Sequence, residues 1–198
     1  MKFRRLPLIL AGCLISALAL RALGHPGHAT GGFVAGLAHP LWGIDHVLTM
    51  VAVGIWASQL GGRATWLVPL SFLAFMVAGA GAAFAGLQVA SSAVDQAVAA
   101  SLLIMGLFVA SALHMPTLRG VALAALFAAL HGYAHGTELH AGISAAAYGA
   151  GFIGTTTCLL AAGVMTAALF EKLRQPSVIR IAGASFAIAA LLLLGGVL

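Results

Sequence analysis

The stretch TWLVPLSFLAFMVAGAGAAFAGL, residues 65–87, decides the class of fold to which this chain belongs. It carries no charged side chain, and as a helix rising about 1.5 Å per residue it can cross the roughly 30 Å hydrocarbon core of a bilayer. The chain as a whole is 62% hydrophobic and 7% charged, whereas about a quarter of the residues in a globular protein are charged. The sequence therefore predicts an integral membrane protein.

Apolar runs of this kind recur along the chain, with short breaks between them that contain Gly, Pro, Ser or Arg. They cover residues 33–57, 65–87, 95–113, 119–135, 141–170 and 177–197. We expect an all-α, polytopic bundle of six transmembrane helices that forms a single domain over residues 25–198, with no room for a soluble nucleotide-binding domain. Ser92 and Asp95 have the pattern of a capping box and predict the start of the third helix.

The first 24 residues have the layout of a cleavable signal peptide. The basic stretch MKFRR precedes the apolar LPLILAGCLISALAL, and Ala22, Leu23 and Gly24 offer a small-residue cleavage pattern. A retained first span remains an alternative, as does a lipoprotein signal at Cys13, although the apolar run continues well past that cysteine. After cleavage Cys158 has no partner, so no internal disulfide is expected.

Charge in the remaining chain is nearly balanced, so the pI of about 10.0 does not indicate a nucleic-acid partner. All basic residues beyond the leader fall in loops that follow the odd-numbered runs. They are Arg63, Arg119, Lys172, Arg174 and Arg180. Because cytoplasmic loops collect Lys and Arg, we predict a multi-pass protein of the bacterial inner membrane with both ends of the mature chain outside.

Polar side chains interrupt the first run in HPLWGIDHVLTM, residues 39–50. On a continuous helix four of them share one stripe, and Asp45 lies about 100° to its side. The stripe consists of His39, Gly43, His46 and Met50. Pro40 suits the first turn of a helix, and Gly43 leaves space between the two histidines for something to approach.

A second polar cluster ends the fourth run, in LHGYAHGTELH, residues 130–140. His131 and His135 are one helical turn apart and Glu138 lies three residues further, so all three share a stripe if the helix continues past Gly136. In the predicted topology both clusters lie in the outer half of the membrane, at matching depth.

The chemistry of the two clusters indicates a metal site. An ionised Asp in a span costs about 2.5–3.5 kcal/mol, so such groups pair, face a cavity or serve a function. The alternative is that Asp45 forms a purely structural pair with one histidine. Structural pairing requires only one partner for each group, whereas these two clusters contain four histidines and two carboxylates. Imidazole and carboxylate without thiolate suit Ni²⁺, Co²⁺ and Zn²⁺. The candidate ligands are His39, Asp45, His46, Met50, His131, His135 and Glu138.

Four other histidines allow two interpretations each. His25 and His28 either gather metal at the entrance or belong to a flexible tail. His114 is either an exit station with Met115 or a helix-end group that bonds backbone carbonyls. His140 is either a further ligand or a loop residue.

Small residues four apart predict close helix packing. They are Gly142, Ala146, Ala150 and Gly154 in the fifth run, and Gly79 and Ala83 in the second.

The two motifs, in this order, resemble those of the HupE/UreJ family of small membrane proteins associated with hydrogenase and urease systems. The resemblance covers essentially the whole chain, including the signal and the HPGH stretch that follows it. It implies a secondary permease that takes up nickel or cobalt for metalloenzyme assembly. The matching positions are His39, Pro40, Gly43, Asp45, His46 and Met50, then His131, Gly132, His135, Gly136 and Glu138. The first motif is also similar to the H-x4-D-H signature of the nickel/cobalt transporter family. That signature has four residues between the histidine and the aspartate, whereas this chain has five between His39 and Asp45. The difference indicates similar chemistry but not membership of that family.

We therefore predict transport of a divalent ion into the cytoplasm, with no enzymatic activity, no bound cofactor and no nucleic-acid partner. The ion and the lipid bilayer are the expected partners, and a homo-oligomer stays open. In this hypothesis His39 and Glu138 receive the ion and Met50 lines the inner side. The residues that hold it midway are Asp45, His46, His131 and His135. The sequence does not separate nickel from cobalt or zinc.

Two other functional classes remain alternatives. In the first, histidines of the first and fourth runs ligate a haem b in an electron-transfer protein, although Asp45 and Glu138 would then have no purpose. In the second, a bound metal and Glu138 as base form a membrane hydrolase, although no nucleophile or oxyanion arrangement stands out.

Overall fold

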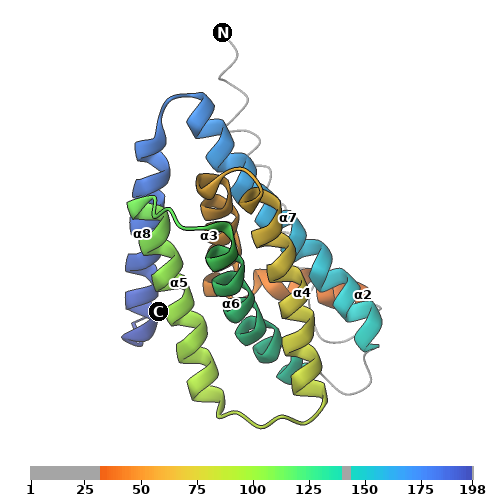
Figure 1. Ribbon diagram of the computed structural model, residues 1–198. Helices are drawn as coiled ribbons and strands as arrows, with labels where there is room; N and C mark the ends of the chain where they lie inside the picture. Colours follow the sequence, from red (N-terminus) through yellow and green to blue (C-terminus); the bar gives the residue numbers. More distant parts are fainter. Residues whose placement is uncertain (1–31, 140–143, 198) are drawn as a thin grey trace.

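The computed structural model describes residues 32–139 and 144–197, and these residues form an all-helical bundle without strands, as predicted (Figure 1). The helices are α2 (Gly32–Ala38), the 3-10 helix η2 (His39–Leu41), α3 (Ile44–Leu60), α4 (Ala64–Phe84), α5 (Ser91–Ser111), α6 (Thr117–Thr137), α7 (Ala145–Lys172) and α8 (Pro176–Leu194). The predicted signal peptide over residues 1–24, together with His25, His28 and His140, lies outside the described residues.

Helices α4 to α8 are each long and apolar enough to cross a membrane, and α2 with α3 makes a sixth span if the bent pair is counted as one. Each of the last five predicted runs overlaps one of these helices. The predicted capping box at the start of α5 is wrong, because α5 begins at Ser91 and no side chain caps it. The chain around Ala90 is extended, and the helix starts from backbone hydrogen bonds alone.

The first predicted span is not a continuous helix. The segments 32–41 and 44–60 meet at an angle of 80°, so α2 lies across the bundle while α3 runs along it (Figure 1). The cause is local, because Pro40 lacks an N–H and its ring excludes the backbone carbonyl four residues earlier, which ends α2 at Ala38. Gly43 is extended, with φ −94° and ψ 116°, and α3 starts directly after it. The single stripe expected for residues 39–50 is therefore wrong.

Glycines set the closest helix contacts, and they do so within three groups of helices. In the first group α7 packs on α2 and α3, where a Cβ atom on Gly36 would lie 2.0 Å from the carbonyl oxygen of Tyr148. In the second α4 packs on α6, where a Cβ on Gly132 would lie 1.9 Å from the oxygen of Met76. In the third α5 packs on α8 through Gly106. Such contacts suit a membrane, where close backbone packing replaces the hydrophobic drive.

The glycines in these contacts are only partly those predicted. Gly79 on α4 does face the backbone of α6, with a Cβ position 2.1 Å from the oxygen of Ala129. On α7, however, Ala146 and Ala150 are exposed, and the close contacts use Gly151 and Gly163. Gly142 lies outside the described residues. Four-residue spacing indicates that one face of a helix consists of small residues, but it does not show that a neighbouring helix packs on that face.

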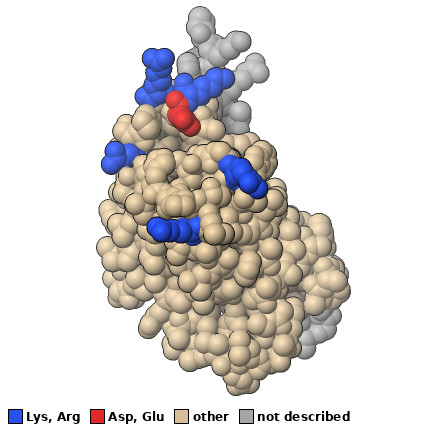
Figure 2. Space-filling view, in the orientation of Figure 1, with Lys and Arg blue, Asp and Glu red and all other residues tan. Residues whose placement is uncertain are grey.

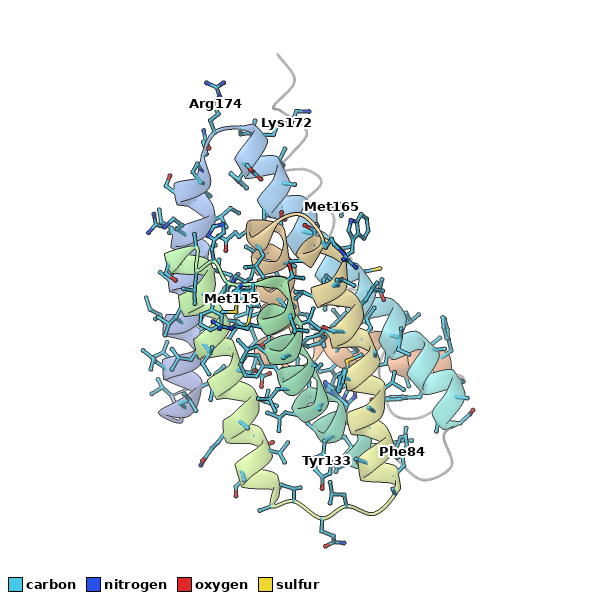
Figure 3. The ribbon with its side chains drawn as sticks, in the orientation of Figure 1. Phe84, Met115, Tyr133, Met165, Lys172 and Arg174 are labelled. Carbon is cyan, nitrogen blue, oxygen red and sulfur yellow. The ribbon has the colours of Figure 1, made fainter. Side chains whose placement is uncertain are left out.

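The interior of the bundle is apolar, and the basic residues lie at one end. Trp56, Phe72 and Met50 are fully buried at its centre. Figure 2 shows Lys and Arg side chains gathered in the upper half of the visible face, and Figure 3 places Lys172 and Arg174 there, opposite Tyr133. The basic residues thus share one end of the bundle, as the sequence pattern predicts, but Arg119 and Arg180 lie within α6 and α8 and not in loops.

The glycine contacts predict that Gly163→Ala destabilises the bundle. A Cβ atom at this position would lie 2.3 Å from the carbonyl oxygen of Val51, and the backbone cannot move away cheaply. Overpacking of this kind costs about 1–3 kcal/mol. We expect a lower thermal unfolding temperature for the protein purified in detergent.

Gly149→Ala on the same helix is the matched control, because no atom lies within 4 Å of its Cβ position. Alanine favours helix by about 1 kcal/mol over glycine, so this variant should unfold at an equal or higher temperature. Equal losses for the two variants would contradict the close-contact explanation.

Candidate metal centre

The polar side chains of η2, α3 and α6 meet at one place in the bundle. The α6 part of the cluster lies around Tyr133, at the end opposite Lys172 and Arg174 (Figure 3). Tyr133 fixes this end of α6, because its hydroxyl donates to the carbonyl of Leu87 at 2.7 Å and accepts from the N–H of Val89 at 2.9 Å. The loop after α4 is thereby held against the helix that carries the second motif.

The outer part of the cluster consists of His39, His135 and Glu138, which we call the exposed group because Glu138 reaches the surface, although His135 itself is buried. Nε2 of His39 lies 2.8 Å from Oε2 of Glu138 and 2.9 Å from Nδ1 of His135. The same Glu138 oxygen lies 3.5 Å from Nδ1 of His135. One ligand atom from each residue lies within 4.8 Å of the other two, an arrangement that can hold a metal ion.

Asp45 and His46 begin α3, directly after the extended Gly43. The carboxylate of Asp45 accepts hydrogen bonds from the backbone N–H of His46 at 2.9 Å and from its Nδ1 at 2.8 Å. A carboxylate in the first turn also faces the positive end of the helix dipole. The hydrogen bond to Nδ1 orients the His46 ring and leaves the lone pair on Nε2.

The imidazoles of His46, His131 and His135 form the buried group. The ring centroid of His46 lies 4.3 Å from that of His135 and 5.1 Å from that of His131. Nδ1 of His131 donates to the carbonyl oxygen of Phe127 at 2.8 Å, which again leaves the lone pair on Nε2. All three Nε2 atoms are buried and make no hydrogen bond to a described residue.

Exposure falls from Glu138 through His39 and His46 to His131, and His135, which belongs to both groups, is buried. The side chain of Glu138 is 55% exposed and that of His39 27%, whereas His46 is 15% exposed and His131 fully buried. Hydrogen bonds from His135 and His39 hold the pKa of the Glu138 carboxyl well below its usual range. An ionised carboxylate thus stands at the accessible end of a row of imidazoles.

The structure brings six of the seven predicted ligands together: His39, Asp45, His46, His131, His135 and Glu138. Helix α6 continues through Thr137, so its predicted stripe of His131, His135 and Glu138 is confirmed. Met50 is fully buried in the apolar core, and its place among the ligands stays a prediction.

Sequence analysis missed the side chains that surround the imidazoles. Phe152 on α7 packs on His135 with ring centroids 4.5 Å apart, and Tyr148 lies 5.5 Å from His39. The hydroxyls of Tyr148 and Thr49 are buried without a described partner. A hydroxyl in an apolar run is the only sequence signal for them, and it is too common to select these two.

His114 lies apart from this cluster. Its Nδ1 lies 2.8 Å from the carbonyl oxygen of Ala112 at the end of α5, which agrees with the carbonyl-bonding interpretation. It lines a pocket of about 340 Å³ together with Gln59 and Glu171. Glu171 directly precedes Lys172, so this pocket belongs to the basic end of the bundle.

The packing of the histidines gives the haem alternative no support. Their rings contact one another directly, in edge-on or tilted arrangements. No space for a porphyrin remains between rings whose centroids are 4.3–5.1 Å apart.

Comparison with known proteins agrees with the two motifs. The family described as HupE / UreJ protein matches residues 13–193. The chain is also similar to Protein HupE of Rhizobium leguminosarum bv. viciae, with 40% identity over 185 residues that cover 92% of this chain and 95% of that relative. No solved structure matches the chain.

The start of α3 predicts that Gly43→Ala disturbs the site without unfolding the protein. A Cβ atom there would lie 2.6 Å from Nδ1 of His46 and 2.7 Å from Oδ1 of Asp45. These side chains can move, whereas a φ of −94° suits alanine, so the strain falls on their hydrogen bond. Loss of such a supporting contact lowers metal affinity about 10–100-fold.

Equilibrium binding of Co²⁺ to the protein purified in detergent measures this effect. Gly81→Ala serves as control, since its Cβ position meets no atom within 4 Å. If Gly43→Ala binds Co²⁺ with unchanged affinity, the Asp45–His46 pair does not belong to the metal site.

Proposed function

The chain belongs to the HupE/UreJ family, and from this premise we propose that it carries a divalent transition-metal ion, nickel or cobalt, across the bacterial inner membrane into the cytoplasm. The ion is the substrate and not a resident cofactor. The protein acts as a secondary transporter with six spans, in which α2 and α3 together make one bent span, and it catalyses no chemical reaction.

One observation carries this proposal. His39 lies within 2.9 Å of His135 and Glu138, although 96 and 99 residues separate them along the chain. Two helical segments thus contribute donor atoms to one point, in a bundle whose other spans are apolar. Imidazole nitrogen and carboxylate oxygen are ligands that suit Ni²⁺, Co²⁺ and Zn²⁺.

The fall in exposure from Glu138 to His131 supports a route into the bundle. An ion arriving at the ionised Glu138 exchanges its water ligands first for an exposed carboxylate and His39, and then for buried imidazoles. Each step replaces lost hydration by a new donor atom, so the ion never lies bare in an apolar medium. The accessible groups belong to the end away from the basic loops.

The membrane potential provides the driving force. With the basic end in the cytoplasm, in line with the positive-inside rule, the exposed group opens outside. Moving two positive charges inward then releases about 4.6 kcal/mol per 100 mV. No nucleotide-binding domain is needed, and an enzyme that incorporates the metal inside the cell keeps the gradient inward. Hydrogenase or urease assembly is the expected destination.

Uptake of radioactive nickel by cells that lack other nickel importers tests this function. We expect Asp45→Asn and His46→Ala to lower accumulation at least tenfold at equal membrane levels of protein, because each removes a donor atom or its support. The matched controls are Asp95→Asn, an exposed carboxylate on α5, and His114→Ala.

Control variants should take up nickel as the parent does. If the Asp45 and His46 variants also accumulate as much nickel as the parent, the site does not transport the metal. If the parent itself takes up no nickel or cobalt under these conditions, the proposed substrate class is wrong.

A further inference from the structure

We propose that the site binds the ion at two successive positions that share His135. The first position uses Nδ1 of His135 in the exposed group, and the second uses Nε2 of the same ring in the buried group. The inference rests on the proposed function for the direction of movement only. The exposed position is inferred from donor atoms that lie close together, and the buried position from nitrogens left unpaired on neighbouring rings.

The exposed position has its three donors already in contact. Nε2 of His39 lies 2.8 Å from the Glu138 oxygen and 2.9 Å from Nδ1 of His135. Donor atoms bound at about 2.1 Å around a tetrahedral ion lie roughly 3.4 Å apart, so the group has to open by only about half an ångström. Glu138 is more than half exposed, so the ion reaches this position from water.

The buried position consists of three nitrogens that have no other function in the structure. Nε2 of His46, His131 and His135 is buried without a hydrogen-bond partner among the described residues. A buried polar atom left unsatisfied destabilises the fold, and three of them on the ring of His46 and on the two rings that it contacts indicate a ligand.

Two of these rings are held in the form that binds metal. Asp45 accepts the Nδ1 proton of His46, and the carbonyl of Phe127 accepts that of His131, so both Nε2 atoms present a lone pair. This is the arrangement in which a hydrogen bond to one ring nitrogen orients the other toward a metal. Three imidazoles with an open fourth place are a known geometry for a borderline divalent ion.

His135 connects the two positions because its two nitrogens have different neighbours. Nδ1 contacts His39 and Glu138, whereas Nε2 is buried on a ring that touches His46. A neutral imidazole has one nitrogen lone pair and one N–H, so the ring binds at one position at a time. The ring therefore holds its proton on Nε2 when the ion occupies the exposed position and on Nδ1 when the ion occupies the buried position, and it carries one proton in both states.

This arrangement is tested by Co²⁺ binding to the full protein purified in detergent, followed by visible absorption and by the number of ions bound. The parent should bind one ion per chain. Glu138→Gln removes the exposed position and His131→Asn the buried one, and each variant should still bind one ion. Their Co²⁺ spectra should differ from each other, because the remaining donors differ. His135→Ala should lower the affinity at least a hundredfold.

His114→Ala is the control for loss of a histidine and should bind as the parent does. His131 is fully buried, so His131→Asn can fail to fold. In that case His46→Gln replaces it, because this variant removes a less buried donor of the same group. A single common site predicts that the Glu138, His131 and His135 variants lose affinity to the same extent. That result, or full binding by His135→Ala, overturns the proposal.

The binding result and the transport result are independent. If Co²⁺ binding shows two positions but cells take up no nickel, the proposed function is wrong and the proposal that the two positions share His135 still stands. Normal uptake through one common site would refute the shared His135 alone.

Discussion

The contact of His39 with His135 and Glu138 is the interaction on which the rest of the site depends. It joins the short 3-10 turn after α2 to the end of α6, two segments that otherwise hardly contact each other. Because water is scarce inside a membrane bundle, polar groups that enter it must satisfy one another. The bend at Pro40 and Gly43 makes this contact possible, since it directs His39 toward α6 while His46 starts a new helix deeper in the bundle.

Backbone packing explains why the site lies where it does. Glycines lock α2 and α3 onto α7, and α4 onto α6, with contacts between backbones. The donor atoms come from both of these groups, so they occupy the interface between them. Across that interface, contacts are made by side chains, as where Gly120 on α6 faces the side chains of Leu60 and Trp56. A pocket of about 440 Å³, lined by His135, lies between α4 and α6 on one side and α7 on the other.

The electrostatic arrangement links the fold to transport. A carboxylate stands where the cluster meets the surface, and imidazoles lie behind it. The basic residues gather at the other end, which the positive-inside rule assigns to the cytoplasm. In the proposed transport, the Glu138 carboxylate meets the cation first and the imidazoles provide the further donor atoms.

The sequence by itself determined that the chain is a membrane protein, where five long helices lie and which residue types could bind a metal. Apolar length and composition carry this information, and they act locally. It also placed His131, His135 and Glu138 on one stripe, because one regular helix holds them. Only the tertiary structure decided that the first span bends by 80°, because Pro40 and Gly43 allow several paths and packing on α7 selects one. It alone decided that His135 has donors on both sides, since those neighbours come from a segment about 90 residues away in the chain.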